Sequence, residues 1–377
     1  MHLTASAPLR VLMVTPRFFP DVGGVETHVY QVARRLAHAL VNVTILTTDR
    51  SGQLPTSELL EGITVRRVRA WPEQRDYYFA PEITRVITQG SWDVVHCQSY
   101  HTLVAPMAML AALRAHIPYV VTFHGGGHSS RLRTLLRRGQ WGVLHPLLAR
   151  ADRLVAIARF EIGLYGRALR LPPERFVFIP NGAEVGTGSP SPAQPGEGTL
   201  ITSIGRLERY KGHQRVIAAL PEVLKQRPDV RLRIAGSGPY ETALRQQAEA
   251  LGIADRVEIG AIPPTDRQGM ADLLSRAALV TLLSDYETHP IAALEALALG
   301  RPVLVTQTSG LAELAEQGWA RSIPCASTPD QTAGAILEQL RRPLIPPEIS
   351  LPTWDDCADG LLHLYQDVTR KPMLCAS

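Results

Sequence analysis

The stretch ALVTLLSDYETHPIAALEALALGRPVLVTQT, residues 278–308, contains a complete strand–helix–strand unit. It starts with an apolar run at 278–285, passes through a polar turn, and continues as an apolar helix that Gly300 ends. The apolar run at 302–308 predicts a second strand. Two apolar strands joined by a helix indicate parallel strands that helices cover on both faces.

The same alternation of short β-branched runs and helical patterns continues along the chain, which predicts one parallel α/β sheet in each half. Helical spacing of apolar residues predicts helices at Thr27 to Leu40 and Trp354 to Val368. The predicted strands are 10–16, 42–49, 63–70, 92–99, 118–125, 152–158 and 175–180 in the first half, and 199–207, 230–238, 256–262, 278–285 and 302–308 in the second.

A chain of 377 residues is longer than one hydrophobic core usually serves, so two domains are expected. The segment at 184–198 is rich in Gly, Pro and Ser and predicts a linker. It separates an N-terminal domain at 1–183 from a C-terminal domain at 199–350, and a final helix occupies 351–377. Open parallel sheets bind ligands beyond the carboxyl ends of their strands, so we expect a cleft that faces both sheets.

The composition is that of a soluble globular protein, with 45% hydrophobic and 20% charged residues. Its apolar runs are too short for a signal-peptide core or a membrane span, which predicts a cytoplasmic protein. The four cysteines are far apart and lack the spacing of a zinc site, so we expect reduced thiols. They are Cys97, Cys325, Cys357 and Cys375.

The net charge of +4 is distributed unevenly. Residues 1–190 hold 21 Arg and 13 acidic residues, a balance of +8, whereas residues 191–377 hold 18 basic and 22 acidic residues, a balance of −4. The basic excess is densest in Arg131 to Arg153. This segment has two interpretations, a peripheral contact with the anionic inner face of a membrane or a solvated helix face. We predict no nucleic-acid partner.

The turn at 285–289 and the helix after it carry two acidic residues, Glu287 and Glu295. Carboxylates accept paired hydrogen bonds, which suits the vicinal hydroxyls of a ribose or hexose. We expect both to face one site. On spacing alone the alternative is that Glu287 only favours a helix N-terminus and that Glu295 is an exposed helical acid.

Pro290 suits the first helical position, because its missing N–H would be unpaired there in any case. The backbone N–H groups of His289, Ile291 and Ala292 would then point out of the helix start, where they favour a phosphate. We expect the buried stripe of this helix to consist of Ile291, Leu294, Ala298 and Leu299.

The stretch SIGRLERYKGHQRVI, residues 203–217, places Gly205 at a strand end and Arg206 and Lys211 around a tight turn. Two cations at a helix start suit a diphosphate, although a solvated basic turn gives the same pattern. Gly236 opens GSGPYE, which lacks the third glycine of a dinucleotide fingerprint and so disfavours a nicotinamide enzyme.

The first half contributes two further candidates. Gly23 and Gly24 precede a helix, and glycines let the backbone approach a ligand closely, but a plain loop is an equal alternative. His124 ends a predicted strand beside three glycines, at the edge where ligand-binding residues lie.

Together these stretches resemble the family 4 (RfaB/WaaG-like) retaining glycosyltransferases of the GT-B fold. The resemblance covers nearly the whole chain, with the motifs in the family's order. They are Gly23-Gly24, His124-Gly125, IPNG at 179–182, GRLERYKG at 205–212, IAGSGP at 234–239, RVEIGAI at 256–262, and the E-x7-E pair of Glu287 and Glu295.

This resemblance implies two Rossmann-like domains with a cleft between them and a last helix that returns to the N-terminal domain. The C-terminal domain would hold a UDP- or GDP-sugar and the N-terminal domain an acceptor. Arg206 and Lys211 would neutralise the leaving diphosphate, and Glu295 would bind the ribose. Glu287 and His124 would lie at the donor sugar. Further residues implied at the donor are Gly23, Gly24, Gly205, Gly236, Ile262, His289, Pro290, Ile291 and Ala292.

The reaction that the resemblance implies retains configuration and requires neither a metal nor another cofactor. Its acceptor is a carbohydrate, a lipid-linked molecule or a small molecule. The N-terminal half of the sequence contains no motif that distinguishes these classes. The family usually reads EGFG where this chain has Glu287-Thr288-His289-Pro290, so the donor sugar stays open. The alternatives are a sucrose- or trehalose-type synthase of the same fold and a non-catalytic protein that binds nucleotide sugars.

Overall fold

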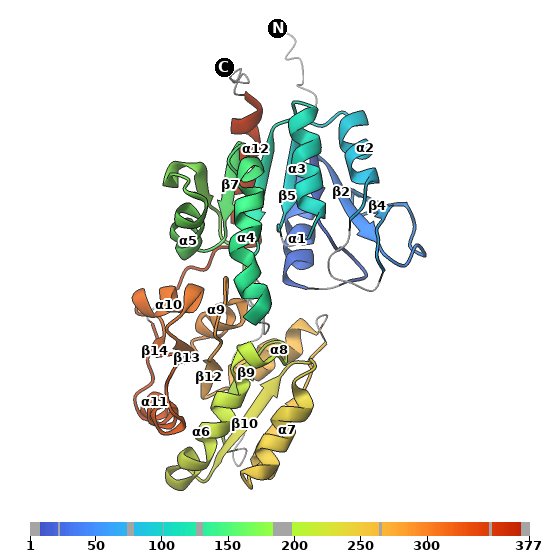
Figure 1. The fold of residues 1–377 in the computed structure, drawn as a ribbon. Helices are drawn as coiled ribbons and strands as arrows, with labels where there is room; N and C mark the ends of the chain where they lie inside the picture. The colour runs from blue at the N-terminus through green and yellow to red at the C-terminus, as the bar shows by residue number, and fades with distance from the viewer. Residues whose placement is uncertain are drawn as a thin grey trace. The chain divides into compact units, whose positions relative to one another are not determined.

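The computed structural model describes residues 8–21, 23–73, 79–100, 102–125, 131–183, 198–263, 266–346 and 349–370, and only the backbone at 131–138. The chain divides into two compact units (Figure 1). The N-terminal unit comprises Met1–Gly125, Thr134–Gly182 and Pro352–Ser377. The C-terminal unit comprises Gly126–Arg133 and Ala183–Leu351. Of the predicted linker, only Gly198 lies within the described residues.

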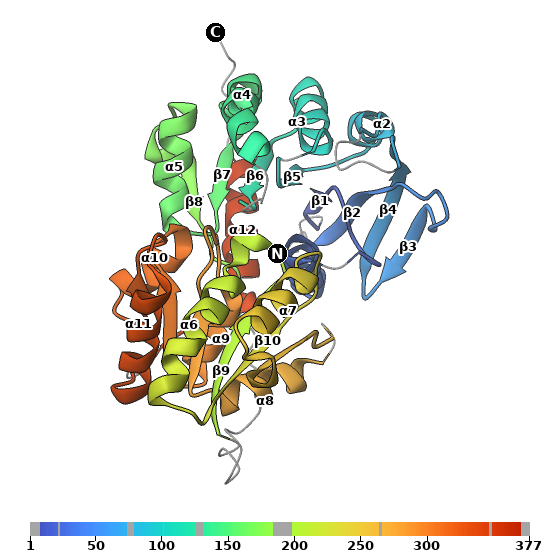
Figure 2. The ribbon, with the colours of Figure 1, turned by 60° about the horizontal axis from the view of Figure 1, so that its bottom comes forward.

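The N-terminal unit is built on an eight-stranded sheet in the order β3-β4-β2-β1-β5-β6-β7-β8. All neighbouring strands are parallel except β3, which runs antiparallel to β4 at one edge (Figure 2). The strands are β1 (Arg10–Val14), β2 (Asn42–Asp49), β3 (Ser57–Leu60), β4 (Ile63–Arg69), β5 (Val94–Gln98), β6 (Tyr119–Phe123), β7 (Arg153–Ala156) and β8 (Phe176–Phe178).

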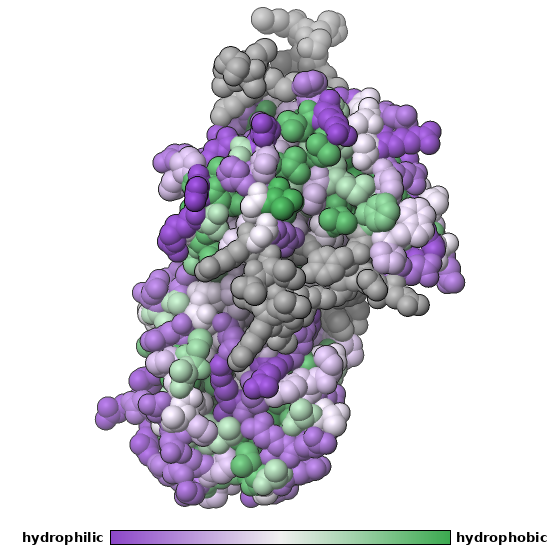
Figure 3. Space-filling view, viewed as in Figure 1, coloured by the Kyte–Doolittle hydropathy of each residue, from purple (hydrophilic) through white to green (hydrophobic). Residues whose placement is uncertain are grey.

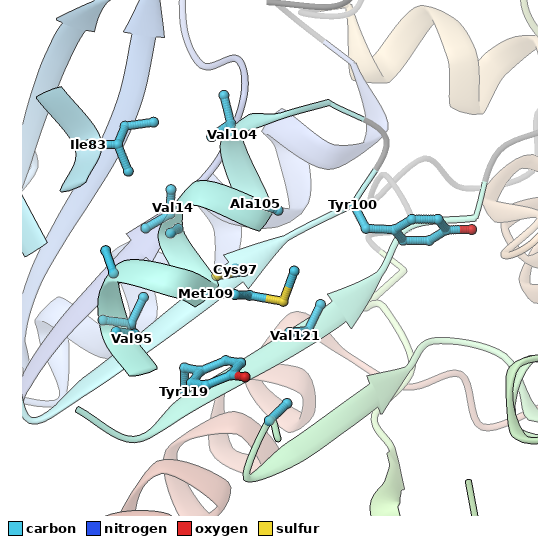
Figure 4. Close-up of a cluster of buried hydrophobic side chains, with 14 of the residues drawn as sticks. Val14, Ile83, Val95, Cys97, Tyr100, Val104, Ala105, Met109, Tyr119 and Val121 are labelled. Carbon is cyan, nitrogen blue, oxygen red and sulfur yellow. The ribbon is translucent and has the colours of Figure 1, made fainter. Parts of the chain in front are cut away.

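Helices cover both faces of this sheet. One face packs on α2 (Glu82–Gln89), α3 (Val104–Arg114), α4 (Arg131–Leu148) and α5 (Arg159–Leu169). Figure 4 shows part of that core, where Met109 of α3 lies against strand residues such as Val95 and Val121. The other face packs on α1 (Gly24–His38) and α12 (Trp354–Arg370). The last helix therefore belongs to the N-terminal unit, as the resemblance implied.

The C-terminal unit contains a six-stranded parallel sheet in the order β11-β10-β9-β12-β13-β14. Its strands are β9 (Thr199–Ile204), β10 (Val230–Ala235), β11 (Val257–Gly260), β12 (Leu279–Leu282), β13 (Val303–Thr306) and β14 (Arg321–Ile323). One face packs on α6 (His213–Gln226), α7 (Glu241–Ala250) and α11 (Pro329–Arg341). The other packs on α8 (Arg267–Arg276), α9 (Ile291–Ala298) and α10 (Ser309–Glu316).

All twelve predicted strands are present, with ends shorter by up to three residues. Two short strands escaped the prediction. β3 alternates between exposed and half-buried residues at the sheet edge, and β14 has only three residues, one of them buried, so neither shows an apolar run. None of the helices in the described part of the chain is long and apolar enough to cross a membrane.

The packing of α12 predicts that this helix stabilises the N-terminal unit. Leu361 is completely buried, whereas its neighbour Leu362 is only partly buried. We expect Leu361→Ala to lower the free energy of unfolding by about 2–5 kcal/mol, because a core cavity remains. Leu362→Ala removes the same atoms and is expected to cost clearly less. Urea unfolding of both variants measures the difference, and equal losses would contradict this placement of α12.

Candidate functional site

Three loops meet at the carboxyl edge of the second sheet, because β9, β12 and β13 are neighbours in it. The loop after β9 contains residues 205–212, the loop after β12 contains residues 283–290, and the loop after β13 leads into α10. This edge is where parallel α/β sheets bind ligands.

Gly212 brings the first two loops into contact. It has a φ of +78°, and a Cβ atom there would lie 1.8 Å from the carbonyl oxygen of Leu283. Hydrogen bonds fix the approach: the Asp285 amide donates to the Tyr210 carbonyl at 2.7 Å, and the Ser284 hydroxyl donates to the Lys211 carbonyl at 3.3 Å. A side chain at position 212 would push the loops apart.

This contact places Lys211 beside Glu287. The Lys211 ammonium forms an ion pair with the Glu287 carboxylate, and both side chains are largely buried. The Lys211 Nζ atom also lies 5.5 Å from the ring centroid of Tyr210. Two residues that are 76 positions apart therefore form one charged pair at the strand ends.

Arg206 reaches the same group of residues through Tyr210. One guanidinium nitrogen donates to the Tyr210 hydroxyl at 2.7 Å, and another lies 3.0 Å from a carboxylate oxygen of Glu208. The Arg206 side chain is 68% exposed, so its charge remains accessible to a ligand. The structure thus brings together Arg206, Lys211 and Glu287, three residues that the sequence analysis had assigned to one ligand site.

A buried histidine holds the backbone of the Arg206 loop by hydrogen bonds. His213 begins α6, its Nε2–H donates to the Arg206 carbonyl at 3.2 Å, and its Nδ1 accepts from the Ser203 hydroxyl at 2.8 Å. Burial lowers the pKa of His213 to about 4, so the ring is neutral at neutral pH. A neutral ring links the strand to the loop without adding charge near the two cations.

The third loop holds the backbone of Glu287. The Glu287 amide donates to the Ser309 hydroxyl, and the Gly310 amide donates to the Glu287 carbonyl, each at 2.8 Å. Ser309 has a φ of +44°, a region that favours glycine, and its hydroxyl makes a contact that glycine cannot. The peptide groups before and after the Glu287 Cα atom are therefore both held by hydrogen bonds.

The start of α9 differs from the prediction in two respects. Pro290 is buried and directly precedes the helix, which begins at Ile291. The Ile291 amide donates to the His289 carbonyl at 3.0 Å, so the expectation that it points freely out of the helix is wrong. His289 and Ala292 are half-buried at the same helix start.

The predicted buried stripe of α9 is also wrong apart from Leu294. Ile291 and Leu299 are only half-buried and Ala298 is exposed. The buried residues form a continuous block, because α9 packs between the sheet, α8 and the neighbouring loops. They are Ala293, Leu294, Glu295, Ala296 and Leu297.

Glu295 is not an exposed helical acid, since its side chain is only 7% exposed. One carboxylate oxygen accepts a hydrogen bond at 2.5 Å from Arg267 of α8, whose side chain is half exposed. A nearly buried carboxylate is stable only with such a partner. Arg267 therefore keeps a charged acid at the place that the resemblance assigns to the ribose.

The remaining candidates in this unit line the same edge. Gly236 follows β10 and passes so close to Gly205 that a Cβ atom would lie 1.9 Å from the Gly205 carbonyl oxygen. Ile262 is half-buried just after β11. The close glycine contact allows the loops after β9 and β10 to run side by side.

The N-terminal unit, described by itself, holds the other three candidates. Gly23 precedes α1 with an extended φ of −164°, and a Cβ atom on Gly24 would meet nothing within 4 Å. A Cβ atom on Gly23 would lie 2.5 Å from a carboxylate oxygen of Glu26, so only Gly24 has open space around it. His124 is buried directly after β6, with Nε2 2.7 Å from the Gln98 side-chain oxygen and its ring 4.8 Å from that of His28.

The sequence did not single out four residues that this geometry uses. Tyr210 and His213 lie inside GRLERYKGH, so their position next to the two cations was the available signal. Ser309 was not among the candidates, and only the structure shows the contact of its hydroxyl with the Glu287 amide. Arg267 is 28 residues from Glu295, and no spacing rule connects them.

Chemically, the edge offers an exposed guanidinium, a lysine–carboxylate pair and a buried, paired carboxylate. Guanidinium and ammonium groups bind phosphate oxygens, and carboxylates bind sugar hydroxyls. Among the described residues no cluster of three His, Cys, Asp or Glu side chains has the arrangement of a metal site. The charges and hydrogen-bonding groups thus match a sugar linked to phosphate.

Comparison with known proteins supports this class. Residues 22–186 match the model of Glycosyltransferase Family 4, and residues 189–346 match that of Glycosyl transferases group 1. A D-inositol 3-phosphate glycosyltransferase of Acidothermus cellulolyticus is 29% identical, with 98% of this chain and 93% of the relative covered.

Solved structures agree on the fold. Sucrose-phosphate synthase of Thermosynechococcus elongatus has a TM-score of 0.70 at 18% identity, with 96% of each chain covered. The Anabaena protein HepE in complex with UDP has the same score and identity, with 96% of this chain and 98% of HepE covered. The fold and site thus define a glycosyltransferase of the GT-B class. The chain belongs to glycosyltransferase family 4.

The loop contact at Gly212 generates a stability prediction. Gly212→Ala combines left-handed strain with a clash against Leu283, so we expect a loss of about 2–5 kcal/mol in unfolding free energy. Gly252→Ala is the matched control, because Gly252 has a φ of +68° but open space around it. The control is expected to lose only about 1–2 kcal/mol. Urea unfolding with equal losses in both variants would show that the clash does not exist.

Proposed function

We propose that the protein is a retaining glycosyltransferase that moves a sugar from a UDP- or GDP-sugar to an acceptor hydroxyl. The observation that carries this proposal is the Lys211–Glu287 pair with Arg206 beside it at the carboxyl edge of the second sheet. The UDP in the HepE structure, which shares the fold, favours a uridine nucleotide as the first ligand to test.

In the proposed reaction the bond between the anomeric carbon and the donor phosphate breaks, and a bond from that carbon to the acceptor oxygen forms. The leaving diphosphate takes the acceptor proton on the same face of the sugar, so configuration is retained without a protein nucleophile. Arg206 and Lys211 stabilise the negative charge that develops on the diphosphate. These two fixed cations supply the counter-charge, and we therefore propose a reaction without a metal or other cofactor.

The acidic residues orient the donor in this proposal. Glu287 lies at the donor sugar and shares the Lys211 ammonium with the diphosphate. Glu295 binds the ribose, with Arg267 maintaining its charge. The amides of His289 and Ala292 face the phosphate and sugar at the start of α9, and Ile262 lies at the base. His124, Gly23 and Gly24 are contributed by the N-terminal unit, which also supplies the acceptor site.

Substitution of the charged groups tests the proposal. We expect Lys211→Ala to lower the release of UDP from UDP-glucose by about 10²–10³-fold, because a fixed charge at the leaving group is lost. Glu295→Gln is expected to lower kcat/KM by about 10²-fold, because one of the two carboxylate oxygens that accept from the ribose hydroxyls becomes an NH₂ donor. The matched controls are Lys225→Ala and Glu249→Gln, which change exposed residues on α6 and α7.

The same assay with GDP-glucose covers the second nucleotide class. Turnover close to wild type in both Lys211→Ala and Glu295→Gln would refute the assignment. Binding of UDP without turnover on any acceptor or water would instead support the non-catalytic alternative. A melting temperature that rises with UDP concentration gives the binding measurement.

The acceptor is proposed by class only. The name of the Acidothermus relative indicates a phosphorylated polyol as its acceptor. The resemblance to the family also suggests acceptors in polysaccharide or glycolipid synthesis. Inositol 3-phosphate, sugar phosphates and a membrane extract therefore form the three arms of an acceptor screen. A preference for sugar phosphates would favour the sucrose- or trehalose-type synthase.

We also propose that α4 brings the N-terminal unit to an anionic membrane surface. Leu144 and Leu148 fix the inner side of α4, while Val143 is 78% exposed. Leu103 and Leu110, at the start of α3 and within it, are exposed as well, and Figure 3 shows hydrophobic side chains gathered on this face of the unit. Apolar side chains beside the basic segment Arg131 to Arg153 are the combination that peripheral membrane binding uses.

Charge reversal in this segment tests membrane contact. We expect the triple variant Arg133→Glu, Arg137→Glu, Arg138→Glu to lose most of its co-sedimentation with phosphatidylglycerol vesicles, because each basic residue contributes about 1 kcal/mol at such a surface. The control with the same change in net charge replaces exposed arginines of the C-terminal unit, namely Arg231, Arg276 and Arg342. Equal sedimentation of the first variant and wild type would exclude this mode of docking.

A further inference from the structure

Four polar side chains form a buried group on one face of the N-terminal sheet. His96 and Gln98 lie on β5, and Thr122 lies on β6 with His124 directly after that strand. Gln98 and Thr122 are paired across the two strands, and alternate residues share a face. The face is the one covered by α1 and α12, and three of the four residues are completely inaccessible to solvent.

Buried polar groups are costly unless they are hydrogen-bonded. The His96 ring meets this requirement with two hydroxyl groups. Its Nδ1 lies 2.5 Å from the Tyr365 hydroxyl of α12, and its Nε2 lies 2.7 Å from the Thr122 hydroxyl. Burial lowers the pKa of His96 to about 3, so the ring is neutral, and hydroxyls satisfy a neutral ring in either tautomer.

The position of Gln98 against His96 fixes the orientation of its amide. The amide nitrogen lies 3.2 Å from Nδ1 and 3.3 Å from Nε2 of His96. Equal reach to both nitrogens places it over the face of the ring, because a position in the ring plane would clash with the carbon between them. The face of an aromatic ring attracts an N–H group and repels a carbonyl oxygen. The NH₂ group therefore faces His96, and the oxygen faces His124.

That oxygen can only accept a hydrogen bond, and it lies 2.7 Å from Nε2 of His124. We propose that Gln98 is a positioning residue that holds the His124 imidazole with a proton on Nε2, and that His96 fixes the Gln98 amide for this purpose. When the His124 ring is neutral, this tautomer has its lone pair on Nδ1. A sugar hydroxyl that meets this nitrogen must donate its proton. This last consequence depends on the proposed function, whereas the state of the ring does not.

Long-range ¹H–¹⁵N NMR spectra of the full chain test the proposal without any ligand. They distinguish the two tautomers of a neutral histidine, and His124→Asn identifies the His124 signals by their loss. We expect wild-type His124 to have Nε2 protonated. We expect Gln98→Glu to raise the midpoint of its titration by about 1–2 pH units, because a carboxylate in place of the amide favours the imidazolium. The ring of His28 in α1 lies 4.8 Å from the His124 ring and is present in both proteins, so it does not account for a difference between them.

A matched control separates positioning from general damage to a core. Gln339 is another fully buried glutamine, in the C-terminal unit, and its side chain bonds to Val303, Arg321 and Leu344. Gln339→Glu is expected to leave the His124 titration unchanged. A proton on Nδ1 in wild type would overturn the proposal, as would a Gln98→Glu midpoint equal to that of wild type. The wild-type tautomer decides the question even if the Gln98 variant does not fold.

Inactivity of the wild-type enzyme on UDP- and GDP-sugars would refute the proposed function but leave this NMR result intact. With turnover established, a pH profile adds the functional readout. We expect the acidic limb of kcat/KM for UDP-glucose to move to higher pH in Gln98→Glu, because His124 then becomes cationic at higher pH. A limb at the wild-type position would show that the ring state does not matter to the reaction.

Discussion

The contact between Gly212 and Leu283 is the constraint on which the C-terminal site depends. Backbone atoms of adjacent strand ends pass within a distance that no side chain permits, and a left-handed φ turns the chain directly into α6. Because of this contact, Lys211 meets Glu287 and Tyr210 bonds to Asp285. A glycine here therefore determines which charges face one another, although it carries no functional group itself.

The charges assembled in this way are balanced within the protein. Arg206 is paired with Glu208, Lys211 with Glu287, and Glu295 with Arg267. A diphosphate that binds there would share the Lys211 ammonium with Glu287, and this largely buried cation is already desolvated before the ligand binds. The exposed arginines, Arg206 and Arg267, give a ligand access, whereas the more buried partners hold the geometry. Such pairing reduces the reorganisation that binding requires.

The sequence predicted the architecture well because apolar runs report buried parallel strands directly. It failed for β3 and β14, where edge position or short length removes that signal. Residue type together with the family resemblance proposed Arg206, Lys211, Glu287 and Glu295 as site residues, but not their partners. Arg267 and Ser309 are joined to these residues only by the fold. The buried stripe of α9 was mispredicted because a helix enclosed on several sides has no single apolar face.

In both units a buried histidine with hydrogen bonds to its neighbours supports the strand ends. In each, a buried neutral histidine bonds to a strand hydroxyl and supports a candidate residue of its own unit or that residue's neighbour. His213 joins Ser203 to the Arg206 loop, and His96 joins Thr122 to Tyr365 while its face orients Gln98. A neutral imidazole suits this role because it both donates and accepts in fixed directions. It also adds no charge that would compete with the cations or with His124. The hydrogen bonds of these rings therefore offset the free-energy cost of burying them and also fix the positions of the neighbouring candidate residues.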